Sequence, residues 1–97
     1  MRRRYLVAYD VSDPKRLRKM FKTMRGYGDH LQYSVFMCDL TAQEKVLMLA
    51  AVTKVFHAKE DRVFVVDLGA SRARGKDRVE FLGRAPEEFP VDGAVVV

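Results

Sequence analysis

The chain has 97 residues, with 18 Lys and Arg against 13 Asp and Glu, a formal net charge of +5 and a single cysteine, Cys38. The length predicts one domain, and the lone cysteine excludes an internal disulfide and suits a reducing, cytoplasmic setting. No apolar run is long enough to cross a membrane. The basic residues cluster in residues 1–25 and 72–78, which favours a polyanion such as nucleic acid as partner over an evenly solvated surface.

The first predicted element is a buried strand over residues 5–10, in which five apolar residues run into Asp10. Ser12, Asp13 and Pro14 follow, and they predict the start of a helix with Asp13 as its cap. Asp10 therefore lies where a strand gives way to a helix, an edge of an α/β sheet that commonly holds ligands. An aspartate after a strand is most often a turn residue, but in so basic a chain it is also a candidate ligand.

Residues 14–25 predict a helix whose apolar residues follow the spacing of one helical face. The basic residues Arg16, Arg18 and Lys22 lie off that face or near its edge. A solvated helix surface accounts for each of them singly, and phosphate contacts are the functional alternative. Gly26 and Gly28 predict a left-handed cap at the end of the helix.

Residues 30–39 are rich in β-branched and aromatic side chains and predict a strand or a short bent pair of strands, a choice that the pattern leaves open. A helix joins this segment to the strand at 5–10, so the two are expected near each other in one sheet. Thr41 to Glu44 form a capping box, which predicts a helix to about residue 57. Apolar residues cover much of the circumference of this helix, and we expect it to be well buried.

The rest of the chain predicts a strand at 62–68, a basic loop at 71–78 and a short strand at 79–83. The tail at 84–97 ends on four apolar residues, Ala94–Val97. A bare edge strand of this kind would be an aggregation hazard. The tail is therefore expected either to close its own sheet or to add to the sheet of a second copy.

The familiar catalytic and metal motifs are missing from the sequence. Cys38 stands alone, the two histidines are far apart, and there is neither a nucleophile elbow nor a glycine-rich phosphate loop. Asp10 is the remaining candidate. One carboxylate alone is a weak site for Mg²⁺. A twofold dimer that pairs two copies of Asp10 would supply a two-carboxylate site on the symmetry axis. The metal would then polarise a phosphodiester while nearby arginines hold the backbone phosphates.

A family resemblance is carried by four segments in order: YLVAYDVSDPKRLRK, GYGDHLQYSVFMCDLT, DRVFVVDLG and VEFLG. With them the chain resembles the smaller of the two protein families universal to CRISPR spacer acquisition, Cas-two. The strand that ends in Tyr-Asp, the basic first helix and the Gln-x-Ser-Val-Phe segment occur at family spacing. The resemblance covers about residues 4–83 and is much less diagnostic over the tail.

The resemblance implies an α+β, ferredoxin-like βαββαβ sandwich at residues 1–83 with extra C-terminal strands. It also implies a symmetric homodimer, in which a short strand of the extension at 84–97 often joins the partner subunit's sheet. Asp10 matches the metal ligand and catalytic residue of a Mg²⁺-dependent endonuclease, with Mn²⁺ as an alternative metal, acting on single-stranded RNA or double-stranded DNA. His30 stands where many members have an arginine, and a mostly neutral imidazole is a weaker phosphate ligand.

Further site residues follow partly from the resemblance and partly from the charge pattern. The candidate nucleic-acid-binding residues are Arg16, Arg18, Lys22, Arg72, Arg74, Lys76 and Arg78. The candidate substrate contacts are Tyr9, Ser12 and Phe36, although a structural role is the more frequent one for Tyr9 and Ser12.

Three functions remain open on this basis. The first is a CRISPR adaptation protein, a homodimer that binds duplex DNA and bridges the larger acquisition integrase. The second is a metal-dependent nuclease acting through Asp10. The third is a toxin-like endoribonuclease of the same fold that is not tied to spacer acquisition.

Overall fold

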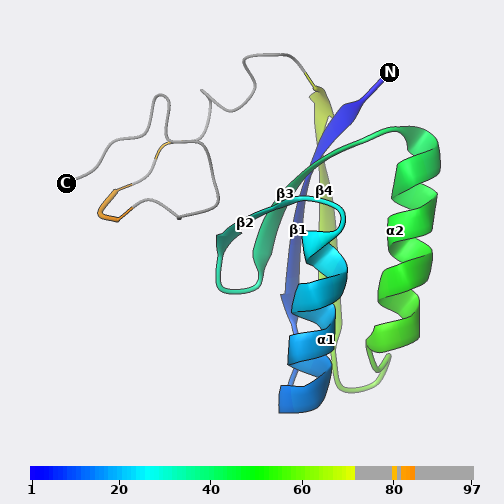
Figure 1. Ribbon diagram of the computed structural model, residues 1–97, viewed down its shortest axis with the longest axis vertical. Coiled ribbons are helices and arrows are strands. Elements are labelled where there is room, and N and C mark those ends of the chain that lie inside the picture. The colour runs from blue at the N-terminus through cyan, green and yellow to red at the C-terminus, as the bar shows by residue number, and fades with distance from the viewer. Residues whose placement is uncertain (72–79, 81, 85–97) are drawn as a thin grey trace.

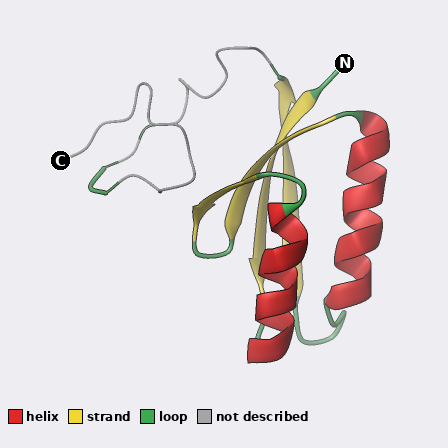
Figure 2. Cartoon of the chain, in the orientation of Figure 1, coloured by secondary structure: helices red, strands yellow, loops and turns green. Residues whose placement is uncertain are grey.

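A computed structural model of the chain describes residues 1–71, 80 and 82–84. In chain order the elements are β1 (Arg3–Asp10), α1 (Pro14–Arg25), β2 (Asp29–Gln32), β3 (Val35–Leu40), α2 (Ala42–Val55) and β4 (Arg62–Ala70) (Figure 1). The strands form one sheet in the order β2-β3-β1-β4, and every neighbouring pair is antiparallel. This is the α+β, ferredoxin-like arrangement that the resemblance implies. Both helices cover the same face of the sheet (Figure 2).

Capping side chains set where both helices begin. Asp13 accepts a hydrogen bond from the backbone N–H of Arg16 at 2.9 Å, and Pro14 occupies the first helical position of α1. Thr41 accepts from the backbone N–H of Glu44 at 3.1 Å, and the Glu44 carboxylate accepts from the Thr41 N–H at 2.9 Å. Both predicted helix starts are confirmed, because local side-chain chemistry fixes them.

The segment at 30–39 is a pair of strands, and only its second half neighbours the first strand. β3 pairs with β1, while β2 lies at the edge of the sheet beyond β3. Tyr33, at a φ of 40°, and Ser34 make the turn between them.

The prediction of a left-handed cap after α1 is wrong. Gly26 has a φ of −75°, and neither it nor Gly28 has a positive φ. Gly28 serves a different purpose, because a Cβ there would lie 2.6 Å from the carbonyl oxygen of Met37 and would also collide with Cys38. The chain after α1 therefore passes too close to β3 for any side chain.

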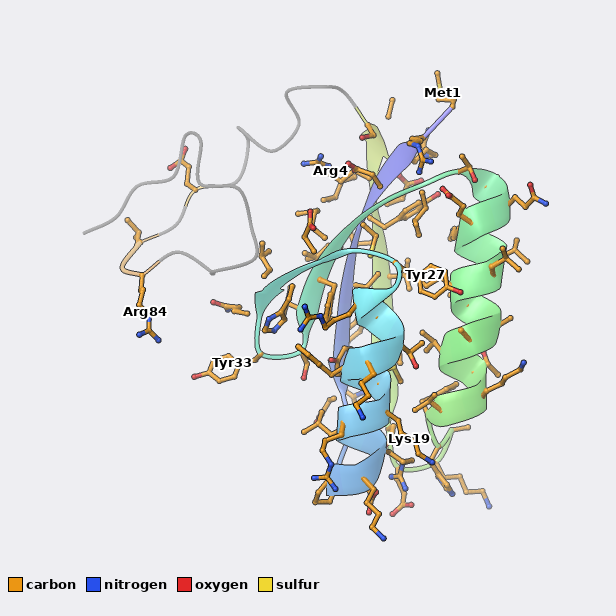
Figure 3. All side chains as sticks on the ribbon, viewed as in Figure 1. Met1, Arg4, Lys19, Tyr27, Tyr33 and Arg84 are labelled. Atoms are coloured by element: carbon orange, nitrogen blue, oxygen red, sulfur yellow. The ribbon has the colours of Figure 1, made fainter. Side chains whose placement is uncertain are left out.

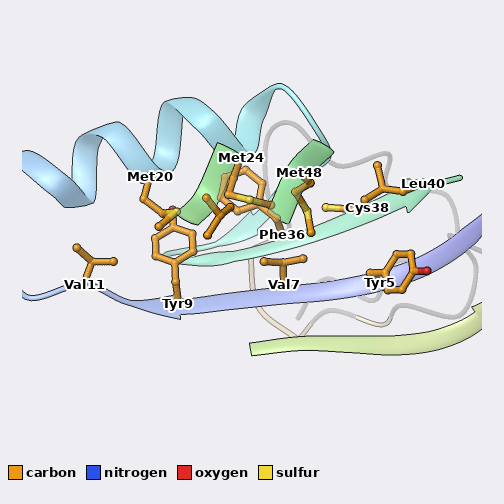
Figure 4. Packing of buried hydrophobic residues seen from close by; sticks show 11 residues of the cluster. Tyr5, Val7, Tyr9, Val11, Met20, Met24, Phe36, Cys38, Leu40 and Met48 are labelled. Atoms are coloured by element: carbon orange, nitrogen blue, oxygen red, sulfur yellow. The ribbon is translucent and has the colours of Figure 1, made fainter. Parts of the chain in front are cut away.

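The core lies between the sheet and the two helices (Figure 4). Its fully buried side chains are Val7, Met20, Met24, Phe36, Cys38 and Met48. The strand residues among them alternate with residues that point to the other face, as the pleat of a strand requires. Burial raises the pKa of the Cys38 thiol to about 12, which makes it a packing residue rather than a nucleophile.

The prediction that the second helix, α2, is well buried is wrong. The helix ends at Val55, and only Met48 and Val52 are buried. Val46 is 64% exposed and Leu47 is 55% exposed. The reason is that the helix carries apolar side chains around most of its circumference, whereas only one side of it packs against the rest of the domain.

The C-terminal predictions fall largely outside the described residues. Within the predicted strand at 79–83, residues 82 and 83 form a bend rather than a strand. The boundary at residue 83 and the tail strand at 94–97 stay predictions. No helix in the described part of the chain is long and apolar enough to cross a bilayer.

Candidate functional site

Asp10 is the last residue of β1 and is exposed. Tyr9, its neighbour, points to the helix-covered face and is buried, so the alternation of the strand directs Asp10 to the opposite face with Leu6 and Ala8. The Asp10 carboxylate makes no hydrogen bond or ion pair with any residue that the structure describes. The carboxylate is therefore available to a ligand, and it lies on the face of the sheet that the helices do not cover.

That face of the sheet carries an apolar surface, which we call the open face. Its members come from three strands: Leu6, Ala8, Val35, Met37, Phe64, Val66 and Leu68. Phe64, Val66 and Leu68 on β4 are exposed, whereas Leu6, Ala8 and Val35 are half-buried and Met37 is buried. Both described helices lie on the other side of the sheet. A monomer rarely leaves a row of three large apolar side chains in water, and exposed apolar patches mark contacts with partners.

Arg62 lies directly across from Asp10, as the first residue of β4. Residues paired in this way on one face have Cβ atoms about 5 Å apart, so the guanidinium reaches the surroundings of the Asp10 carboxylate. Arg62 is exposed and has no hydrogen-bond or ion-pair partner among the described residues. Sequence alone did not identify Arg62 as a site residue. The available signal was its position two residues before Phe64 in an alternating strand.

Arg16 has a structural partner. Its Nε and Nη2 donate to the carboxylate of Asp61 at 2.8 and 3.0 Å, and the Asp61 side chain is fully buried. Asp61 also accepts hydrogen bonds from the backbone N–H groups of Ser12 and His57. Hydrogen bonding from Arg16, the largest cause, holds the pKa of Asp61 well below its usual range. Arg16, which the sequence predicts to bind nucleic acid, therefore has a structural role in the ion pair with Asp61.

The candidate substrate contacts separate into one exposed residue and two buried ones. Ser12 is exposed two residues after the end of β1, and its hydroxyl has no described partner. Tyr9 is 7% exposed, and its ring stacks at 6.2 Å on that of Phe36, which is fully buried. Phe36 also packs edge-on against Phe21. We therefore correct the assignment of Phe36 from substrate contact to core packing, because no ligand reaches a ring with no exposed surface.

The remaining predicted contacts lie on α1 and beyond β4. Arg18 and Lys22 are exposed, one helical turn apart, and neither forms an ion pair within the described ranges. The basic loop residues Arg72, Arg74, Lys76 and Arg78 lie outside the described residues. Within one chain, the described residues bring together Asp10, Ser12 and Arg62, but no group of three His, Cys, Asp or Glu that could hold a metal ion.

Comparisons with known proteins agree with one another. The family model described as "CRISPR associated protein Cas2" matches residues 1–75. A relative named "CRISPR-associated endoribonuclease Cas2 1" from Rhodospirillum rubrum is 44% identical over 93 residues, which is 95% of this chain and 89% of the relative. A "CRISPR-associated endoribonuclease Cas2" from Geobacter sulfurreducens is 39% identical over 80 residues, 82% of this chain and 83% of the relative.

Two solved structures have similar folds. Cas2 from Streptococcus pyogenes superposes with a TM-score of 0.69 at 34% identity, over 82% of this chain and 99% of that one. A hypothetical protein from Thermus thermophilus superposes with a TM-score of 0.74 at 28% identity, over 89% of this chain and 96% of that one.

Proposed function

The chain belongs to the CRISPR-associated Cas2 family, and on this premise we propose that it acts as a homodimer that binds nucleic acid and hydrolyses phosphodiester bonds with a divalent metal. Its relatives carry the name endoribonuclease, which supports the reaction class. The single observation that carries the proposal is the placement of Asp10. An exposed, unpartnered carboxylate shares the open face with an apolar surface suited to a second copy.

Packing of two open faces about a twofold axis would explain why a single chain has an incomplete site. An isologous contact uses the same patch twice, so it brings the two β1 strands together. Because Asp10 continues the row formed by Leu6 and Ala8, each copy would then contribute one carboxylate near the axis. Burial of Phe64, Val66 and Leu68 would supply the apolar driving force for this association.

Mg²⁺ fits the donor chemistry of this pair. It prefers oxygen ligands, keeps several waters and is commonly held by one or two carboxylates together with substrate phosphate. The two Asp10 carboxylates would hold it, and Mn²⁺ accepts the same ligands. When bound, the metal would polarise the phosphodiester and lower the pKa of a bound water.

The protein's own contribution would be to position the substrate. Arg62, opposite Asp10, supplies a guanidinium that can hold a phosphate oxygen. Ser12 presents a hydroxyl at the same end of β1, and its backbone is fixed through Asp61. Within CRISPR adaptation, we propose that the same dimer supports duplex DNA on α1 and bridges the larger acquisition integrase.

The test compares Asp10→Asn with Asp13→Asn. Asn caps a helix as well as Asp does, so the control variant keeps α1 intact while it removes a neighbouring charge. We expect Asp10→Asn to lower Mg²⁺-dependent cleavage of single-stranded RNA and double-stranded DNA at least about 100-fold. It should leave duplex binding and spacer acquisition unchanged, and Asp13→Asn should change none of them.

Three outcomes would revise the proposal. Equal loss of cleavage in both variants would remove Asp10 from the metal site. Loss of acquisition in a folded, dimeric Asp10→Asn protein would show that cleavage is needed for that role. Cleavage confined to RNA, with growth arrest on overexpression and no acquisition, would favour the toxin-like endoribonuclease.

A further inference from the structure

A groove of about 470 Å³ lies between α1 and the turn that joins β2 to β3. It is lined by Tyr9, Leu17, Arg18, Phe21, Lys22, Tyr33 and Ser34. Because Tyr9 points to the helix-covered side of the sheet and Asp10 to the other side, the groove is separate from the proposed metal site. Its volume falls within the range of roughly 300–1,000 Å³ that is typical of small-molecule sites.

Two columns of side chains run side by side along the α1 wall of the groove. Leu17 and Phe21 are four residues apart and form an apolar column, while Arg18 and Lys22 form a basic column next to it. No acidic residue lines the groove, and neither basic residue has an ion-pair partner in the described part of the chain. The wall therefore offers an apolar surface beside two unneutralised positive charges.

Tyr33 lines the groove on the side opposite α1. It projects from the turn between β2 and β3 (Figure 3) and is 89% exposed. Its φ of 40° is in the left-handed region, which a tyrosine rarely adopts and which glycine would adopt without strain. The strained turn is nevertheless held in place. The N–H of Tyr9 donates to the carbonyl of Ser34 at 3.0 Å, and the His30 Nε2–H donates to the carbonyl of Tyr33 at 2.7 Å.

We propose that this groove binds an unpaired base of a single-stranded nucleic acid, with Tyr33 stacking on the base and Arg18 and Lys22 contacting the flanking phosphates. Charge complementarity supports this occupant, because a nucleotide combines a flat, weakly polar ring with an anionic backbone. Exposed aromatic rings beside basic side chains are the usual means of binding single strands. A base stacked within a duplex cannot enter the groove, so the site discriminates single-stranded segments from paired ones.

The experiment replaces the ring and relieves the backbone strain in one step. Tyr33→Gly removes the aromatic surface, and its folded protein should be at least as stable as the wild type because glycine accepts the left-handed φ. Tyr33→Phe keeps the ring and is the matched control. The probes are a fluorescein-labelled single-stranded oligonucleotide and the blunt duplex of the same sequence, measured by anisotropy at constant salt.

We expect Tyr33→Gly to weaken single-strand binding roughly 5- to 100-fold, the range of one aromatic–base stack, and to leave duplex binding unchanged. Tyr33→Phe should bind both probes as the wild type does. A 2-aminopurine placed in the single strand should be quenched by the wild type and by Tyr33→Phe, and not by Tyr33→Gly.

This inference rests on the proposed nucleic-acid function, but the two fail differently. If the wild type binds neither probe, the proposed function is wrong. If the wild type binds both probes and Tyr33→Gly weakens neither, or weakens both equally, the groove does not bind an unpaired base. A changed mass of Tyr33→Gly in light scattering would show that the turn is a contact between copies, and would also overturn the inference.

Discussion

Arg16 and Asp61 form a two-pronged ion pair that joins three parts of the chain. The Arg16 guanidinium donates at 2.8 and 3.0 Å to a carboxylate whose side chain is fully buried. The same carboxylate accepts from the backbone of Ser12, two residues after β1, and from that of His57, two residues after α2. The pair therefore fixes the loop that leads from Asp10 into α1, and the geometry of the proposed metal site depends on it.

We predict that Asp61→Asn lowers the melting temperature by about 5 °C or more at neutral pH, because buried donors lose their charged acceptor. The pKa of Asp61 is depressed, so its stabilising contribution is present above the unfolded pKa near 3.9 and is lost as the pH falls through the folded value. The variant should therefore lose less stability on acidification than the wild type does. Thermal melts from about pH 7 to about pH 2 measure both effects, because the loss begins only below the unfolded pKa.

Asp67→Asn is the matched control for this prediction. Arg3 holds Asp67 through hydrogen bonds that also lower the pKa of Asp67, but the pair lies on the surface, where such pairs contribute little. If the two variants shift the melting temperature by the same amount, burial of Asp61 is not what makes the Arg16 contact important.

Gly28 and Gly26 provide a second, independent prediction. Gly28→Ala should destabilise the fold by roughly 1–3 kcal/mol, because the new methyl group would overlap the backbone of β3. Gly26→Ala places its Cβ 3.3 Å from the nearest oxygen, at a helical φ, and should change stability by less than about 0.5 kcal/mol. Urea denaturation distinguishes the two, and equal effects would contradict the close approach of Gly28 to β3.

The sequence predicted the parts of this fold that local chemistry determines. Asp13 and the Thr41–Glu44 box set the two helix starts. Short apolar, β-branched and aromatic runs identified the strands. Local sequence did not predict the role of Gly28, because this role arises from the close approach of β3 at Met37, which depends on how β2 and β3 pair. The exposure of Val46 was missed for a similar reason: composition shows that a helix is apolar, but not how many of its sides meet a neighbour.

The site residues, like the fold, were predictable only where local sequence determines them. Asp10 could be chosen because its strand ends there, whereas Arg62 becomes a candidate only when the register of β4 against β1 is known. Arg16 was indistinguishable from Arg18 in a basic helix, since nothing local shows that Asp61 lies beside it. Contacts between distant segments therefore decide which of several similar charges can meet a ligand.

The open face makes a prediction about assembly. Phe64→Glu should convert a dimer into a monomer in size-exclusion chromatography with light scattering, because it places a charge within the apolar surface that two copies would bury. Val46→Glu changes a side chain of similar exposure on α2 and should leave the dimer intact. Dissociation by Val46→Glu alone would assign the contact to the helix face and would separate the two Asp10 carboxylates.

The last prediction concerns the duplex surface of α1. Sequence alone proposes Arg16, Arg18 and Lys22 alike as phosphate contacts, whereas the structure favours Arg18 and Lys22, which are exposed and carry no described ion pair. Each lost phosphate contact reduces the slope of log K against log salt by about 0.9, so the double variant Arg18→Ala, Lys22→Ala should reduce it by about 1.8. Lys54→Ala removes an exposed charge from α2 and should leave the slope unchanged. If the control and the double variant change the slope equally, duplex binding depends on the net charge of the protein rather than on α1. A DNA backbone docked on α1 would contact only the charges that face it.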